Sequence, residues 1–435
     1  MDKKISFWAP LDNAAKIFPA IRTKEHSTVA RITAVLKERV SIKHLFSAIE
    51  LAEKRFPYFK VSLRKGFFWY YLEQIDDPIK VTSDNGRLCK AFDRKDSNKL
   101  LFRILVRNNE ITVEFSHILT DGAGLLQFLK AILIYYFNEK GMISAEQIDP
   151  FYTSKASPEE FEDAYNRYFK EKIPHVISQP KAFHLPFDLN SKPRFDVLLA
   201  MISTKDLKTR ASEKSVSITV FLVAIYLLVL QDIFHECKAK GKRVRRKFAR
   251  IQVPIDLRNI YPTKTMRNFS LFVLPELDFR LGIYSFDEIV NLVHHKMQLE
   301  TDEKLISKII SRNVGGERNV FVRSIPILLK SLILHAKYYA EGTNQFSGVV
   351  TNLGNTRVPD AIADQINYFV LTPPPPNKKV KINCGVIGYK DKLVMSFGNI
   401  TNSKEFERRF LRFLVEQNVK VKILNTCHEQ RDELL

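Results

Sequence analysis

The sequence predicts an α/β fold of two domains, each with a mixed, largely antiparallel sheet and flanking helices. The chain has 435 residues, more than the roughly 250–300 at which a single hydrophobic core stops growing. Both halves alternate apolar hairpins with helical segments and lack a run of regular βαβ units. A proline-containing stretch without periodicity, 173–195, separates the halves. We therefore expect domains at 1–180 and 190–435.

The first half opens with a helix that faces a core. Over 41–56, apolar residues recur every three or four positions, which indicates a helix that Pro57 ends. Aromatic residues that alternate with polar ones over 58–74 indicate a hairpin turning near Gly66. We expect both elements to pack on the same core.

A second hairpin and two helices complete the first half. Alternating residues over 100–119 turn at Asn108 and Asn109, which favour tight turns. Apolar residues at helical spacing fill 124–137, and a polar helix is expected near 158–171. The strand that ends the hairpin leads directly into His117.

The second half mixes strands and helices in the same way. Its most apolar run, 218–234, has 17 residues and contains a Gln-Asp pair, which is short of the roughly 20 apolar residues of a membrane span. We interpret it as a buried core helix. The other elements are expected as strands at 195–203, 248–260 and 267–279, helices near 285–304 and 319–340, a β-rich segment after 345 with a stiff corner at 373–376, and a closing helix at 402–417.

The net charge of +20 raises the question of nucleic-acid binding, because clustered Lys and Arg neutralise phosphates. Here the basic residues are spread along the chain, apart from 238–250, which we interpret as a solvated loop between a helix and a strand. We therefore expect no nucleic-acid partner. A basic surface also suits phosphate-bearing small molecules such as coenzyme A, or an acidic carrier protein.

The cysteines indicate neither a metal site nor a disulfide framework. They lie far apart and form no CxxC pair or His/Cys spacing typical of zinc. The first 20 residues lack the apolar core of a signal peptide. We expect a cytoplasmic protein without a membrane span. The four cysteines are Cys89, Cys237, Cys384 and Cys427.

His117 and Asp121 stand between the strand-like segment and the apolar helix. The spacing alone fits a strand end followed by an Asp that caps the helix. It also fits a general base, because imidazole has a pKa near 6.5 and a sheet edge can hold it rigidly. No nucleophile elbow, P-loop or GxGxxG fingerprint occurs in the chain. If the protein is an enzyme, His117 has few rivals.

The segment SHILTDG, 116–122, resembles the HHxxxDG motif of the chloramphenicol-acetyltransferase-like superfamily. Three further segments, 50–63, 253–273 and 349–359, are similar to family segments in the expected order. The resemblance is closest to the alcohol acetyltransferase and condensation-domain branches. Ser116 stands in place of the first His of the motif, and the DFGWG motif of the plant branch is absent.

The resemblance implies two similar domains with an active-site tunnel between them. His117 Nε2 would take the proton from an acceptor hydroxyl or amine as it attacks a thioester. Asp121 would pair with a cation, for which Lys60 and Arg258 are the candidates. Gly122 would let the backbone turn into the helix, and Gly124 would assist close packing.

The resemblance also implies the substrates. Asn352 and Gly354 are candidates for substrate binding, although a plain turn explains the NLGN segment equally well. The donor would be acyl-coenzyme A, the group an acetyl, and the acceptor a small alcohol or amine, with no permanently bound cofactor and no metal. Alternatives are a freestanding condensation-type protein acting on an acyl or peptidyl carrier protein, and a non-catalytic binding protein of the same fold. A monomer is expected.

Overall fold

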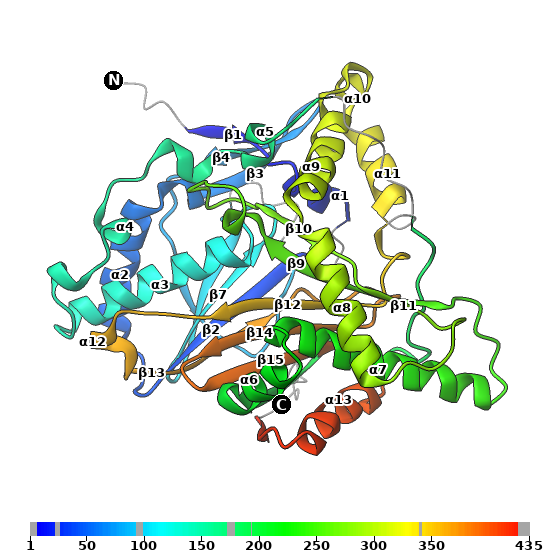
Figure 1. The fold of residues 1–435 in the computed structure, drawn as a ribbon. Helices are drawn as coiled ribbons and strands as arrows, with labels where there is room; N and C mark the ends of the chain where they lie inside the picture. Colours follow the sequence, from blue (N-terminus) through cyan, green and yellow to red (C-terminus); the bar gives the residue numbers. More distant parts are fainter. Residues whose placement is uncertain are drawn as a thin grey trace, which may run out of the picture.

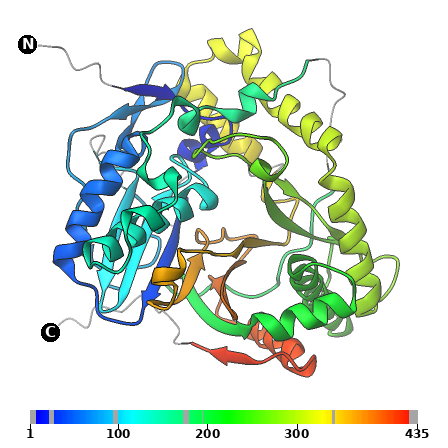
Figure 2. The same cartoon turned by 60° about the vertical axis from the view of Figure 1, so that its left-hand side comes forward.

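A computed structural model describes residues 7–21, 27–92, 99–171, 179–192, 194–338 and 342–424. The elements of the first half (blue to cyan) lie beside those of the second half (green to red), each half with its own sheet and helices (Figures 1 and 2). Most strand pairs are antiparallel. The parallel pairs are those of β12 (Gly348–Asn355) with β9 (Phe248–Asp256) and β14 (Ile382–Tyr389), and of β5 (Val81–Ser83) with β6 (Phe102–Arg107). The predicted α/β class with mixed, largely antiparallel sheets is confirmed.

The first half forms two sheets. A small sheet has the strand order β1-β4-β3, and a five-stranded sheet has the order β13-β2-β7-β6-β5. The strands of this half are β1 (Trp8–Pro10), β2 (Val29–Leu36), β3 (Val61–Lys65), β4 (Tyr70–Gln74), β5 (Val81–Ser83), β6 (Phe102–Arg107) and β7 (Glu110–Ser116). Its helices are α1 (Phe18–Ile21), α2 (Ile42–Arg55), α3 (Gly122–Glu139), α4 (Pro150–Thr153) and α5 (Ala164–Arg167).

The second half builds one larger sheet with the order β10-β9-β12-β14-β15-β8-β16, and β11 pairs with β9. Its strands are β8 (Asp196–Ser203), β9 (Phe248–Asp256), β10 (Ser270–Val273), β11 (Glu276–Asp278), β12 (Gly348–Asn355), β13 (Ile366–Thr372), β14 (Ile382–Tyr389), β15 (Lys392–Asn399) and β16 (Val421–Ile423). Its helices are α6 (Thr204–Glu213), α7 (Ile218–Ala239), α8 (Phe286–Glu300), α9 (Glu303–Arg318), α10 (Val320–Ser324), α11 (Ile327–Lys337), α12 (Asp360–Ala363) and α13 (Glu405–Glu416).

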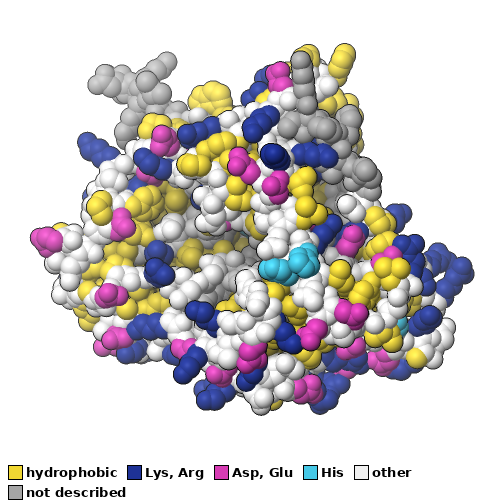
Figure 3. All heavy atoms as spheres, in the orientation of Figure 1, with side chains coloured by type: hydrophobic (Ala, Val, Ile, Leu, Met, Phe, Trp, Pro, Cys, Tyr) yellow, Lys and Arg dark blue, Asp and Glu magenta, His cyan; other side chains and the backbone are white. Residues whose placement is uncertain are grey.

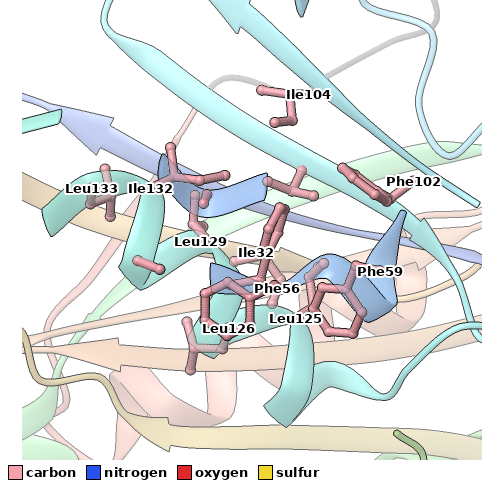
Figure 4. Packing of buried hydrophobic residues seen from close by; sticks show 14 of the residues in the cluster. Ile32, Phe56, Phe59, Phe102, Ile104, Leu125, Leu126, Leu129, Ile132 and Leu133 are labelled. Atoms are coloured by element: carbon pink, nitrogen blue, oxygen red, sulfur yellow. The ribbon is translucent and has the colours of Figure 1, made fainter. Parts of the chain in front are cut away.

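The core of the first half lies between the five-stranded sheet and helices α2 and α3. Figure 4 shows Ile32 of β2 and Phe102 of β6 beside Leu129 of α3 and Phe56 at the end of α2. All eight residues of β2 are buried, although the sequence pattern did not predict this strand. Its buried Arg31 pairs with Asp84, which offsets part of the cost of burying the guanidinium. This packing fixes β7, the strand that leads into His117.

Strand β13 departs from the expected division at 190. It belongs to the second half by sequence, but Leu371 pairs with Ile32 of β2 in the five-stranded sheet. Ser396 of β15 donates a hydrogen bond to the carbonyl of Leu371, so β13 also touches the larger sheet. The chain of the second half therefore completes the sheet of the first half.

The apolar run 218–234 forms most of α7 and lies in the core of the second half. Among the described residues, α7 is the one helix that is long and apolar enough to cross a membrane, and 72% of its most apolar window is buried inside the protein. Tyr226 donates to the carbonyl of Ile382 at 3.0 Å. The interpretation as a core helix agrees with this packing.

The polar helix expected near 158–171 is broken into a 3-10 turn, Pro158–Phe161, and the short helix α5. Contacts with residues about 100 positions away in sequence explain the break. Met266 donates its N–H to the carbonyl of Glu160, and Thr265 donates to the carbonyl of Glu162 at 2.8 Å. These carbonyls would otherwise accept the next bonds of a continuous helix.

Where two helices were expected near 285–304 and 319–340, the structure has α8 to α11. The sequence pattern did not predict α9 as a separate helix. Asp302 caps α9 by accepting from the N–H groups of Lys304 and Leu305. Asn319 caps α10 in the same way, and Pro326 precedes α11. Residues 339 and 340 lie outside the described residues.

The basic run 238–250 spans the end of α7, a loop and the start of β9, as expected. Arg250 is the exception, since it is buried and bonds to Glu276. Cys89, Cys237 and Cys384 are free and buried. Cys427, the first six residues, and 172–178 and 193 of the expected connection lie outside the described residues.

Candidate active site

His117 follows β7 directly, and its backbone N–H donates to the carbonyl of Thr28 at 3.1 Å. Its ring Nδ1 lies 3.2 Å from the carbonyl oxygen of Thr120. A carbonyl only accepts hydrogen bonds, so Nδ1 carries the proton and Nε2 keeps its lone pair. The loop itself thus selects the tautomer in which Nε2 can accept a proton.

The imidazole of His117 lies among aromatic rings. Phe18 of α1 stacks on it with ring centres 5.4 Å apart, and Phe115 meets it edge to face at 5.0 Å. Burial lowers the pKa of His117 below its usual 6.5, while the Asp121 carboxylate and the Thr120 carbonyl oppose this shift. The ring is therefore neutral at pH 7, which is the form that a general base requires.

Asp121 caps α3 and binds a cation. Its carboxylate accepts the N–H of Gly124 at 3.0 Å and the N–H of Phe269 at 2.9 Å. Arg258 donates to it through Nη1 at 3.0 Å and Nη2 at 3.3 Å. The carboxylate, which is buried, is thus bonded to Arg258 and Phe269 of the second half of the chain.

Of the two cations considered as partners of Asp121, Arg258 makes the ion pair and Lys60 does not. Lys60 bonds to Glu53 of α2, seven residues away in sequence. Burial alone would lower the pKa of Arg258. The nearby carboxylates of Asp121 and Asp256 have the larger combined effect, so the pKa of Arg258 is raised. The planar guanidinium donates to both carboxylates through a fixed fork of N–H groups, a geometry that the ammonium of Lys lacks.

The segment before β10 holds the loop of His117 from the second half. Asn268 donates to the backbone carbonyl of His117 at 2.9 Å and to the Asp12 carboxylate at 3.0 Å. Thr120 donates to the carbonyl of Met266. Burial raises the pKa of Asp12 to about 6, although the Arg267 guanidinium opposes the shift. The site therefore lies where the two halves of the chain meet.

Gly122 and Gly124 lie at the start of α3. Gly122 does not have a positive φ, so the turn into α3 does not need the conformational freedom of glycine there; a Cβ on it would lie 3.0 Å from the Leu353 side chain. At Gly124 a Cβ would lie 2.2 Å from Thr120 Oγ1 and 2.4 Å from the backbone oxygen of Met266. Gly124 therefore allows the close approach of α3 to the second half.

Asn352 and Gly354 form a turn at a bulge in β12. Asn352 donates to Thr219 at the start of α7 at 3.0 Å and accepts the N–H of Gly354 at 2.8 Å. Gly354 has a φ of +72°, and a Cβ on it would meet nothing within 4 Å. The turn explains both residues, while their role in substrate binding stays a prediction.

A cavity of about 900 Å³ lies elsewhere, between the small sheet and the end of α9. Its lining does not include the residues around His117, so a tunnel to His117 stays a prediction. Among the described residues, no group of three or more His, Cys, Asp or Glu side chains could hold a metal ion. The cavity is lined by Trp8, Pro10, Lys16, Trp69, Tyr70, Tyr71, Glu73, Asn166, Glu317, Arg318 and Arg323.

Sequence reasoning missed several groups that shape the site. Phe18 and Asp12 have no local pattern that links them to His117, whereas Thr120 stands only three residues after it. Asp256 could have been found, because it stands two residues before Arg258 and shares its guanidinium at 2.8 Å. Long-range hydrogen bonds leave no such trace in a single sequence.

Comparisons with known proteins bear on the fold. No protein-family model and no curated protein matches the sequence. Polyketide synthase associated protein 5 from Mycobacterium tuberculosis superposes with a TM-score of 0.59 at 14% identity, over 93% of this chain and 96% of that chain. The condensation domain from Monacolin K polyketide synthase MokA gives 0.58 at 12% identity, over 94% and 96%.

The TRI101 structure from F. graminearum, complexed with coenzyme A and deoxynivalenol, gives a TM-score of 0.62 at 12% identity, over 95% of this chain and 99% of that chain. The chain therefore shares the fold of these proteins, which agrees with the resemblance in its sequence.

Proposed function

We propose that this protein is an acyltransferase that moves an acyl group, an acetyl in the simplest case, from a coenzyme A thioester to an alcohol or amine. The observation that carries the proposal is the geometry of His117: Nδ1 faces the Thr120 carbonyl at 3.2 Å, so that Nε2 is the basic nitrogen. The solved structures of similar fold include one in complex with coenzyme A and deoxynivalenol.

The reaction needs one base and no covalent enzyme intermediate. Nε2 of His117 takes the proton of the acceptor hydroxyl or amine as its oxygen or nitrogen attacks the thioester carbon. The tetrahedral intermediate then expels the coenzyme A thiolate, which takes the proton back from the imidazolium. General-base catalysis of this kind supplies a factor of about 10² to 10⁴.

Asp121 and Arg258 act through the loop and do not meet the substrate in this proposal. Their ion pair, 3.0 Å between Nη1 and Oδ2, joins the start of α3 to the turn after β9. Asn268 holds the carbonyl of His117 from the same side. Together these bonds keep the imidazole in one orientation, which a general base requires.

The test is His117→Ala, with His295→Ala, an exposed histidine of α8, as the matched control. We expect the first variant to fold and to lose a factor of about 10² to 10⁴ in acyl transfer, and the control to keep the wild-type rate. An unchanged rate in folded His117→Ala would contradict the role of His117.

A second candidate function is condensation on carrier-bound substrates, which the similarity to a condensation domain favours. The two functions differ in the thioester that is used. Mixing the protein with acetyl-coenzyme A, or with a carrier protein charged with the same acyl group, separates them: we expect turnover with the first donor. Turnover with the carrier protein alone would support condensation.

A further inference from the structure

Helix α11 presents its apolar side to solvent. Four aliphatic side chains, Leu328, Leu329, Leu332 and Ile333, are exposed, with Leu332 at 68%. The buried side carries Lys330, which is 3% exposed. An amphipathic helix on the surface of a water-soluble core normally has the opposite arrangement, so this side of α11 needs an apolar environment.

Lys330 ties α11 to the tip of the β3–β4 hairpin. Its Nζ donates to the carbonyl of Phe68 at 3.0 Å and lies 3.4 Å from the centre of the Trp69 ring. The N–H of Ile327 donates to the carbonyl of Phe67 at 2.9 Å. The hairpin tip itself exposes Phe67, at 70%, and Phe68. These bonds hold the hairpin tip and α11 in one surface.

Helix α10 extends this surface with Val320 and Phe321, the latter 84% exposed. Hydrophobic side chains are visible over α10 in Figure 3, with Lys and Arg side chains beside them. We call the exposed side chains of α10 and α11 the apolar face: Val320, Phe321, Leu328, Leu329, Leu332 and Ile333. Exposed apolar side chains gathered on two consecutive helices indicate an interaction site.

The charged side chains within 318–338 are all basic, while Glu317, just before them, pairs with Lys16. The segment 318–338 contains no Asp or Glu, and its Arg318, Arg323 and Lys337 are exposed. Lys65 is exposed beside the hairpin tip. Bulky aliphatic and aromatic side chains flanked by Lys and Arg, on a helix too short to span a bilayer, are the composition of an interfacial membrane anchor.

We propose that the apolar face docks the protein on an anionic lipid bilayer. Helices α10 and α11 lie flat on the bilayer, with their aliphatic side chains among the acyl chains and the flanking cations on the phosphates. Arg318 and Arg323 also line the cavity of about 900 Å³ beside this face, together with Glu73 and Glu317, so the proposal rests on the apolar face and not on this cavity.

The test is co-sedimentation with vesicles of equal parts phosphatidylcholine and phosphatidylglycerol, compared with phosphatidylcholine alone. Wild-type protein is compared with the double variant Leu328→Glu/Leu332→Glu. The matched control, Leu281→Glu/Ile283→Glu, changes two residues as exposed, at 78% and 75%, in the loop before α8. Circular dichroism shows whether each variant is folded. Vesicle binding of His117→Ala shows whether membrane binding depends on the proposed catalytic base.

We expect wild type, the control and His117→Ala to bind the anionic vesicles, and the Leu328/Leu332 variant to lose at least about 10-fold in partition coefficient. Binding should weaken with added salt and on phosphatidylcholine alone. Wild-type protein that binds neither vesicle, or a double variant that binds as well as the control, would overturn the proposal. The proposal would also be overturned if the protein formed a concentration-dependent dimer that buries the apolar face and does not bind vesicles.

Discussion

Replacing Asp121 by Ala removes an acceptor that two halves of the chain share. The carboxylate accepts four hydrogen bonds, from the N–H groups of Gly124 and Phe269 and from Nη1 and Nη2 of Arg258, at 2.9 to 3.3 Å. In Asp121→Ala the start of α3 loses its cap, and Arg258 keeps only Asp256 as an anionic partner.

The expected loss of stability in Asp121→Ala follows from the burial of the ion pair. Removing one member of a buried ion pair costs about 3–5 kcal/mol, because the other charge stays desolvated. Arg258 retains Asp256, at 2.8 Å, so we expect the lower end, about 3 kcal/mol. For a domain of about 150–250 residues, each kcal/mol lowers Tm by about 2–4 °C, which gives a loss of about 6–12 °C.

Differential scanning calorimetry of Asp121→Ala measures this loss directly. The matched control is Asp364→Ala, which breaks the pair of Asp364 with Lys390, two largely exposed side chains; exposed pairs contribute little, so its Tm should stay within about 1 °C of wild type. A folded Asp121→Ala variant with the Tm of the Asp364→Ala control would refute the structural role assigned to Asp121.

Substitution of glycines tests the packing around the motif. Gly124→Ala should lower Tm, because its Cβ would lie 2.4 Å from the backbone oxygen of Met266, and overpacking of this kind costs about 1–3 kcal/mol. The control Gly316→Ala, in α9 with nothing within 4 Å of the new Cβ, should raise Tm slightly. Equal changes of Tm in the two variants would contradict this reasoning. Gly354→Ala should cost about 1–2 kcal/mol through its φ of +72°. If Gly354 serves only the turn, kcat stays unchanged; a loss of kcat at constant Tm would instead favour substrate contact.

Local patterns predicted the elements whose sequence signal is strong. The turn at Asn108, which has a φ of +51°, and the apolar helices α3 and α7 lie where periodicity and turn chemistry indicate. Strand β2 was missed because it is buried over its whole length and carries Arg31 and Thr33 in the core. Because both faces of this strand are buried, apolar and polar residues do not alternate along it, and the usual signal of a strand is absent.

The candidate site was predictable where its residues lie close together in sequence. His117 and Asp121 lie four residues apart, and their motif is local. The choice between Lys60 and Arg258 depended on a contact between positions 121 and 258, which no local pattern encodes. Similarly, a sequence pattern can indicate a helix near α11, but not that its leucines face solvent while Lys330 is buried.

Single-turnover acyl transfer as a function of pH tests the central claim, that the neutral imidazole of His117 is the base. Because burial lowers the pKa of His117 below 6.5, its base form persists as pH falls and is lost only through that lowered pKa. Measured from about pH 5 to about pH 8, the wild-type rate should be flat above 6.5 and fall on the acidic side.

The comparison with His117→Ala decides the claim. We predict that this variant is slower by a factor of about 10² to 10⁴ and that its rate shows no acidic limb. The account is contradicted if the folded variant keeps both the rate and the limb, which would assign the titration to another group, such as Asp12 with its pKa of about 6.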